Sequence, residues 1–290
     1  MHKRNIIEDE FGVLYSRDEM TLIGYNPDVF RCASYIIRDG VAKIEANAFH
    51  DCHTLKSVFM PDSVIKDGGS IFEGCVNLEE VRLSANLKNP DIAMFCGCPA
   101  LHYVELHEGM ESIGENMFCG CKSLKSIKLP STITRLYGDT FCASGISEIV
   151  LGEKIKYIGA DAFLGCYNLR ELTIPSKVDY IGPWFVQGHQ DFEGVICKSD
   201  KFSIENDALI ANKDDSFLAC WSKSKEYHLP ASAKRLRSVC NDQIENLYID
   251  CSLEEIGCEA FISCPSLKNV VCNSVVGTNR SANWKCTRCG

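Results

Sequence analysis

The chain lacks the features that would place it across a membrane or on nucleic acid. None of its 290 residues belongs to a long apolar run of the length, about 18 residues, that a membrane-spanning helix needs. Lysine and arginine number 30 against 39 acidic residues, giving a formal net charge of −9. Nucleic acids and anionic membranes attract basic surfaces, so this balance argues against either as a partner. The N-terminus, MHKRNIIEDEFG, has no apolar core behind its basic residues and does not resemble a secretion signal.

Motifs of the common catalytic classes are also missing. The sequence contains no G-x-S-x-G, no G-x-x-x-x-G-K-[ST] and no H-E-x-x-H. Paired acids such as Glu79-Glu80 are expected at solvated edges. We therefore expect that the protein is not an enzyme and needs no cofactor.

A repeat dominates what is present. Phenylalanine recurs at 49, 72, 95 and 118, a constant interval of 23 residues. Each copy carries the skeleton F-x-x-C-x-x-L-x-x-V-x-L or a close variant of it. Intervals of this size are typical of solenoids, in which one repeat cannot bury its apolar face alone. The end of the skeleton alternates like a short half-buried strand, so stacked copies should form a β-rich solenoid.

Two apolar hairpin patterns, at residues 11–25 and 208–221, frame this array. We predict five parts in chain order. They are an N-terminal hairpin cap (1–30), a first repeat block (31–198), an inserted hairpin (199–226), a second block (227–276) and a tail or cap (277–290).

The copies resemble the BspA-like leucine-rich repeat, I-x-x-x-A-F-x-x-C-x-x-L-x-x-V-x-L-P. Residues 44–61 match this pattern nearly position for position, and the resemblance covers roughly residues 9–276. It implies a curved right-handed solenoid with a parallel sheet on one face and turns or 3₁₀ turns on the other. Members are mostly bacterial or protist proteins regarded as surface or secreted binders of other proteins, and some act as adhesins.

The 18 cysteines fall into several groups. Six follow the marker phenylalanine by three residues, and this regularity predicts a small buried side chain at an inward corner; they are Cys52, Cys75, Cys98, Cys121, Cys166 and Cys264. A second column, Cys96, Cys119 and Cys142, is either a tolerated small residue or a row of accessible thiols. So many unpaired thiols favour a reducing, cytoplasmic location, whereas the family resemblance favours the cell surface.

Cys286-x-x-Cys289 has the spacing of half a zinc site, and Cys258 or Cys272 could supply further ligands. A lone terminal C-x-x-C also arises easily in so cysteine-rich a chain. The alternative function is therefore a thiol-rich zinc-binding or redox-responsive protein.

Strand geometry gives the candidate binding surface. Residues that flank the inward valine of each strand should face outward. They include an alternating charge column, Arg82, Glu105 and Lys128, which is either self-paired surface charge or part of an interface. Aromatic and other polar side chains lie beside it: Phe59, Glu80, Tyr103 and His107. We expect a monomer that binds a protein partner through this face.

Overall fold

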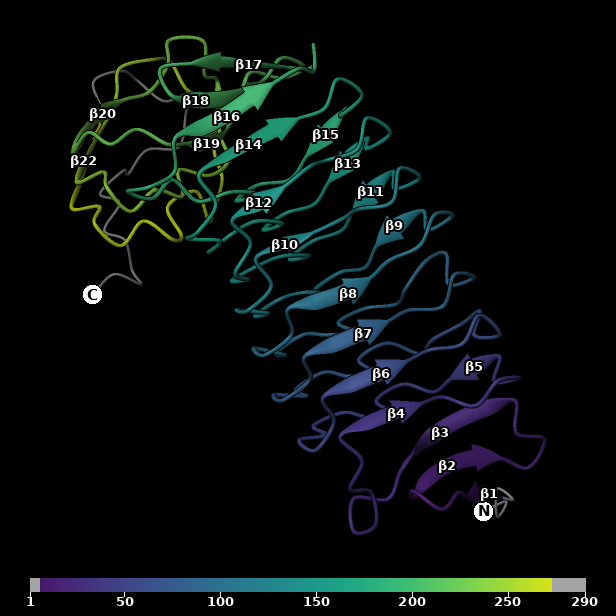
Figure 1. The fold of residues 1–290 in the computed structure, drawn as a ribbon. Coiled ribbons are helices and arrows are strands. Elements are labelled where there is room, and N and C mark those ends of the chain that lie inside the picture. The colour runs from purple at the N-terminus through teal and green to yellow at the C-terminus, as the bar shows by residue number, and fades with distance from the viewer. Residues whose placement is uncertain (1–5, 273–290) are drawn as a thin grey trace.

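The computed structural model describes residues 6–272, which form an elongated stack of short strands and turns (Figure 1). No helix occurs within that range. The predicted β-rich solenoid with parallel sheets is confirmed. Successive turns of the chain lie one above the next from β1 towards β20 and β22, so residues one repeat apart become neighbours in space.

The first face of the solenoid, as we name it, carries the predicted strands. Four of them, β4 (Ser34–Ile36), β6 (Ser57–Phe59), β7 (Glu80–Arg82) and β8 (Tyr103–Glu105), form one parallel sheet in that order. The face continues through β10 (Ser126–Ile127), β12 (Glu148–Ile149), β14 (Glu171–Ile174) and β16 (Gly194–Cys197). Further along the chain, β20 (Glu226–His228), β22 (Asn246–Ile249) and β24 (Asn269–Cys272) form a separate parallel sheet. Partner residues in the first sheet are one repeat apart, as in Ser57↔Glu80↔Tyr103, so the sequence interval sets the register.

A second face also carries short strands, where the sequence predicted only turns. They are β5 (Lys43–Ile44), β9 (Ser112–Ile113), β11 (Arg135–Leu136), β13 (Tyr157–Ile158), β15 (Tyr180–Ile181), β21 (Arg235–Leu236) and β23 (Glu255–Ile256). Strands β9, β11, β13 and β15 pair in parallel. Each is two residues long, too short to show the alternation that marks a strand in sequence.

The core of the repeats is a column of stacked phenylalanine rings. Consecutive rings have centroids 5.4–5.7 Å apart and are nearly parallel, and all are fully buried; they are Phe49, Phe72, Phe95, Phe118, Phe141 and Phe163. Backbone hydrogen bonds run alongside, for example from the amide of Phe95 to the carbonyl of Met117 at 3.0 Å. Adjacent turns are therefore joined along this side as well, although its residues form no strand.

The predicted buried cysteines occupy the inward corner and also act as donors. The thiols of Cys75, Cys98 and Cys121 each donate to the carbonyl of the phenylalanine one turn back, at 3.0–3.2 Å. Burial raises the pKa of all three thiols. Each of these carbonyls also accepts from the backbone amide three residues further on, so the thiol supplies a second hydrogen bond that links adjacent turns.

A small antiparallel sheet closes the N-terminal end. Strands β1 (Ile6–Glu8), β2 (Val13–Ser16) and β3 (Thr21–Tyr25) pair antiparallel, and β3 then pairs in parallel with β5. We call β1–β3 the N-terminal cap. The predicted hairpin is present, but it gains a third strand and joins the second face directly.

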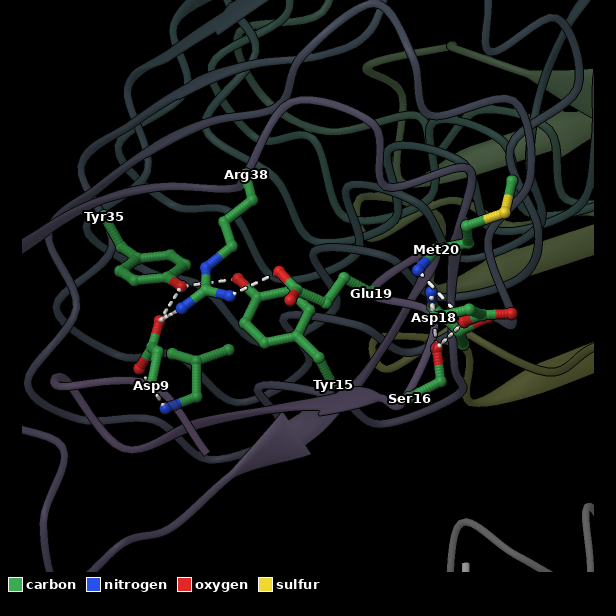
Figure 2. A network of polar contacts seen from close by, with 10 residues as sticks. Asp9, Tyr15, Ser16, Asp18, Glu19, Met20, Tyr35 and Arg38 are labelled. Atoms are coloured by element: carbon green, nitrogen blue, oxygen red, sulfur yellow. Dashed lines mark hydrogen bonds and ion pairs between the residues drawn. The ribbon is translucent and has the colours of Figure 1, made fainter. Parts of the chain in front are cut away.

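Buried polar groups fasten the N-terminal cap to the first repeat (Figure 2). The hydroxyl of Tyr35 donates to a carboxylate oxygen of Asp9 at 2.7 Å and lies 2.5 Å from the hydroxyl of Tyr15. The guanidinium of Arg38 sits 4.7 Å from the Tyr15 ring centroid and pairs with Glu19 at 2.8 Å. Burial, together with hydrogen bonds to Tyr15 and Asp9, raises the pKa of Tyr35, which stays neutral.

The same arrangement appears again before the last turns. Strands β17 (Phe202–Glu205), β18 (Ala208–Ala211) and β19 (Ser216–Cys220) pair antiparallel, and β19 pairs in parallel with β21 of the second face. Here too the predicted hairpin has a third strand. The division of the chain into five parts stays a prediction.

Candidate protein-binding surface

The first sheet places the predicted surface residues in two columns. The central valines of β6, β7 and β8 point inward and are at most 6% exposed. Phe59, Arg82 and Glu105 are partners in register on one side of them, and Glu80 and Tyr103 are partners on the other. The structure therefore brings these five predicted residues together on three adjacent strands.

Arg82 is held in place at the centre of this surface. Its guanidinium carbon lies 4.6 Å from the centroid of the Phe59 ring. The same group donates to the carbonyl of Met60 at 3.0 Å and pairs with Asp62 at 3.1 Å. A backbone hydrogen bond from Ala85 and the charge of Arg82 hold the pKa of Asp62 below its usual range. The Arg82 side chain is thus held in one position, with its positive charge against one face of the Phe59 ring.

The expected alternating charge column is only partly formed. Arg82 lies 3.8 Å from Glu105, a longer separation than its contact with Asp62. Strand β10 ends at Ile127, one residue before Lys128, which is exposed and has no ion pair among residues 6–272. Asp62 was missed by sequence reasoning because it lies in the turn after β6 and belongs to no strand column.

Exposed aromatic side chains flank Arg82. Tyr103 is 53% and Phe59 is 42% exposed, which is high for large apolar side chains. Ile36, the neighbour of Phe59 in the same column, is also exposed and extends the apolar surface. On the other side, Glu80 pairs with His102 at 3.6 Å. The surface therefore combines apolar rings with charges of both signs.

His107 departs from the expectation of an outward-facing side chain. It lies just after β8, is only half-buried, and its Nε2 atom is buried without a hydrogen-bond partner among the described residues. Its imidazole is close enough to Asp62 to lower the pKa of that carboxyl. His107 therefore lies at the edge of this surface.

The family follows from the repeat itself. The model of the BspA type leucine-rich repeat region, in six copies, matches residues 29–144, 91–214 and 192–288. The chain belongs to this family. No match was found among curated proteins.

Solved leucine-rich repeat structures share the fold over most of this chain. A leucine rich cell surface protein of Faecalibacterium prausnitzii has a TM-score of 0.58 and 19% identity, over 92% of this chain and 74% of that one. A leucine-rich repeat protein of Bacteroides ovatus has a TM-score of 0.55 and 18% identity, over 92% and 74%. The pneumococcal vaccine antigen PcpA has a TM-score of 0.54 and 17% identity, over 94% and 71%. At these identities the likeness is one of fold.

A second aromatic cluster lies on the other face of the leucine-rich repeats and was not predicted. Tyr157 and Tyr180 stack with centroids 4.7 Å apart, and the guanidinium of Arg135 lies 5.7 Å from the Tyr157 ring. All three belong to the two-residue strands of the second face. Tyr180 is 46% exposed. This cluster therefore also places an arginine beside an exposed tyrosine, and it can serve as a control for the surface around Arg82 and Tyr103.

The remaining predictions concern metals and membranes. Cys286 and Cys289 lie outside the described residues. Within residues 6–272 no three histidine, cysteine or acidic side chains are grouped so as to hold a metal ion. The same range contains no helix suited to crossing a membrane.

Proposed function

We propose that this leucine-rich repeat chain is a non-enzymatic protein-binding module. Its binding surface is the part of the first face around Arg82, and its anchors are Phe59 and Tyr103. The observation that carries the proposal is the pair of exposed rings beside an arginine that its own neighbours already hold in position.

Physical reasons favour binding at this surface. Interfaces draw most of their binding energy from a few aromatic and arginine side chains near their centre. Ordering a flexible side chain on binding costs about 0.5–1.5 kcal/mol, and the contacts of Arg82 with Met60 and Asp62 have already removed much of that freedom. The strands beneath are hydrogen-bonded in register, so the anchors also sit on a rigid wall.

The charges around the anchors have a different role. Exposed contacts such as Glu80 with His102, which is an ion pair only when the imidazole is protonated, contribute little affinity. Charges of both signs at the rim select partners and set the rate of encounter more than they add affinity. We therefore assign Glu80, Glu105 and Lys128 to specificity, and the aromatic side chains to affinity.

The location is part of the proposal. The cell-surface and vaccine-antigen names of the similar structures support an adhesin-like role outside the cell. The 18 cysteines of this chain support a reducing interior instead. Fractionation of the source cells, followed by protease treatment of intact cells, distinguishes the two: only a surface-exposed chain is degraded.

The test of the binding surface uses matched double variants on the two faces. Tyr103→Ala with Arg82→Glu should weaken binding to a captured protein partner by at least about 30-fold, equivalent to about 2 kcal/mol. Tyr180→Ala with Arg135→Glu makes the same changes on the second face and should leave affinity unchanged. Binding that survives the first pair, or that the second pair removes, would show that the first face is the wrong one.

A further inference from the structure

One corner of the repeat forms a column of residues beside the phenylalanine stack. The amide of Asp139 donates to the carbonyl of Ala160 at 2.9 Å, and that of Asp161 to the carbonyl of Pro183 at 3.1 Å. Asp139, Asp161 and Trp184 therefore occupy the same position on consecutive turns. All three have a φ of 53–57°, so the backbone turns in the same way at each of them.

A cavity of about 210 Å³ lies at this column, between the first repeats and the last one. Its two walls come from parts of the chain that are far apart in sequence, and both parts have the same pattern: D-A-F-L at residues 161–164 and E-A-F-I at residues 259–262. Sites for drug-sized molecules measure about 300–1,000 Å³, so this cavity suits a single side chain or a small ligand. Its lining residues are Asp161, Leu164, Trp184, Glu259, Ile262 and Ser263.

The acids of this cavity have no cation to balance them in the part of the chain that the structure describes. Within residues 6–272 neither Asp161 nor Glu259 forms an ion pair or a side-chain hydrogen bond. Burial, followed by the negative charges of Asp139 and Glu259, raises the pKa of Asp161 to about 6. At pH 7 the cavity therefore holds carboxylates that repel one another, and a cation placed between them would be stabilised.

The other walls of the cavity are largely apolar. Leu164 and Ile262 supply aliphatic side chains, and Ile262 is 42% exposed although it is large. Trp184 supplies an indole whose Nε1 atom is buried without a hydrogen-bond partner among the described residues. Such a donor is rare in native structures and calls for a partner from water or a ligand. Carboxylates beside aliphatic and indole walls are complementary to a cation on an apolar stem.

We propose that this cavity binds an alkylammonium group, carried by a lysine side chain or by a small aliphatic amine. The ammonium lies between Asp161 and Glu259, and the stem packs against Leu164, Ile262 and Trp184. The site is separate from the surface around Arg82, so it gives the chain a second binding function that does not depend on the first.

An inorganic divalent cation fits this cavity less well than an ammonium. Calcium takes 6–8 oxygen ligands. Among the described residues no three acidic, histidine or cysteine side chains are grouped closely enough to hold a metal ion. An ammonium needs fewer ligands, and its stem uses the apolar walls that a bare ion would leave empty.

The test is a saturation-transfer NMR titration of the full chain with pentylamine. We expect a Kd on the order of 1 mM, which suits a ligand of so few atoms. The alcohol 1-pentanol has the same stem without the charge and should bind at least about 10-fold more weakly. Nα-acetyl-lysine methylamide distinguishes the two sources of the ammonium: comparable affinity indicates a lysine side chain, and binding of pentylamine alone indicates a free amine.

Variants of the two acids show whether the amine binds in this cavity. Asp161→Asn should weaken pentylamine binding by about 10-fold or more, and Glu259→Gln by about 3-fold or more because Glu259 is more exposed. Asparagine tolerates the positive φ of position 161, so this variant should fold, as circular dichroism can verify. Glu148→Gln removes an exposed acid on β12 and should leave the affinity unchanged.

The affinity should also fall with pH because a proton competes with the ammonium for Asp161. With a pKa of about 6, the ionised fraction of Asp161 drops about 10-fold between pH 7 and pH 5, and the Kd should rise by the same factor. Asp139 and Glu259 are the other titratable groups that act on Asp161. Asp161→Asn should remove most of this dependence.

Four results would overturn the proposal. They are equal binding of 1-pentanol and pentylamine, an affinity that neither acid variant changes, an affinity that does not vary between pH 7 and pH 5, and no binding of either amine up to about 20 mM.

Discussion

Replacing Phe118 by alanine tests how far the ring column holds the stack together. Phe118 is fully buried, and its ring stacks against Phe95 at 5.7 Å and Phe141 at 5.4 Å. Burying and packing one phenylalanine is worth about 3–5 kcal/mol. Each stacked pair contributes about 0.5–1.5 kcal/mol beyond its buried area, so a ring with a partner on both sides should lie near the upper end. We expect Phe118→Ala to lower the free energy of unfolding by about 4–5 kcal/mol.

Urea denaturation followed by two probes measures this loss. With a slope of about 3 kcal/mol/M, a loss of about 4 kcal/mol lowers the midpoint by about 1.3 M. Circular dichroism reports on the whole stack, whereas the fluorescence of Trp184 and Trp221 reports on its C-terminal part. Because each turn contacts only its neighbours, the dichroism midpoint should fall further than the fluorescence midpoint.

The matched control is Phe261, which occupies the marker position in the last repeat but is only half-buried. Phe261→Ala should cost clearly less because less of the ring leaves water on folding. Equal losses for the two variants, or a loss below about 1.5 kcal/mol for Phe118→Ala, would show that the column is not the main contributor.

Three further changes test other parts of the fold. Tyr35→Phe removes the hydroxyl that donates a hydrogen bond to Asp9. The N-terminal cap should therefore lose about 1–3 kcal/mol of stability, and its backbone amides should exchange hydrogen faster, with no change in later turns. Cys98→Val removes one of the two hydrogen bonds to the Phe72 carbonyl, which still accepts from the amide of Cys75. It should lower the free energy of unfolding by about 0.5–1.5 kcal/mol in urea denaturation, whereas Cys98→Ser should cost less; equal costs would argue against the thiol as a donor. Burial raises the pKa of Asp67 to about 6. Between pH 4 and 6 the carboxyl is therefore protonated in the folded state and ionised in the unfolded chain. The free energy of unfolding should fall as pH rises from about 4 to 6. Asp67→Asn should remove this dependence and stabilise the protein at pH 7 by about 1–2 kcal/mol, and a variant with an unchanged pH profile would refute the assignment.

The sequence was sufficient to predict the first face because its signal is strictly periodic. Phe72 and Val81 are buried, and so are the residues at the same positions one repeat away; the valines also pair in register on adjacent strands. A structure assigned correctly to one repeat therefore predicts that of the next. The outward direction of Phe59 and Tyr103 follows from strand alternation around the inward valines. This is why the candidate surface could be assembled before its geometry was known.

Features that depend on contacts between different parts of a turn could not be predicted. Asp62 pairs with Arg82 from a turn whose path has no periodic signal. Tyr157 and Tyr180 lie on two-residue strands that resemble turns in sequence. The donor role of Cys98 depends on a carbonyl in the preceding turn, which no residue pattern identifies.

Photo-crosslinking tests the central claim, that the first face is the binding surface, most directly. A photoreactive phenylalanine analogue at position 103 should crosslink one protein partner in extracts of the source cells, and Arg82→Glu should abolish the product. The analogue at position 180, where the native tyrosine on the second face is 46% exposed against 53% for Tyr103, should give no such product. Crosslinking at 180 in place of 103, or no dependence on Arg82, would contradict the account.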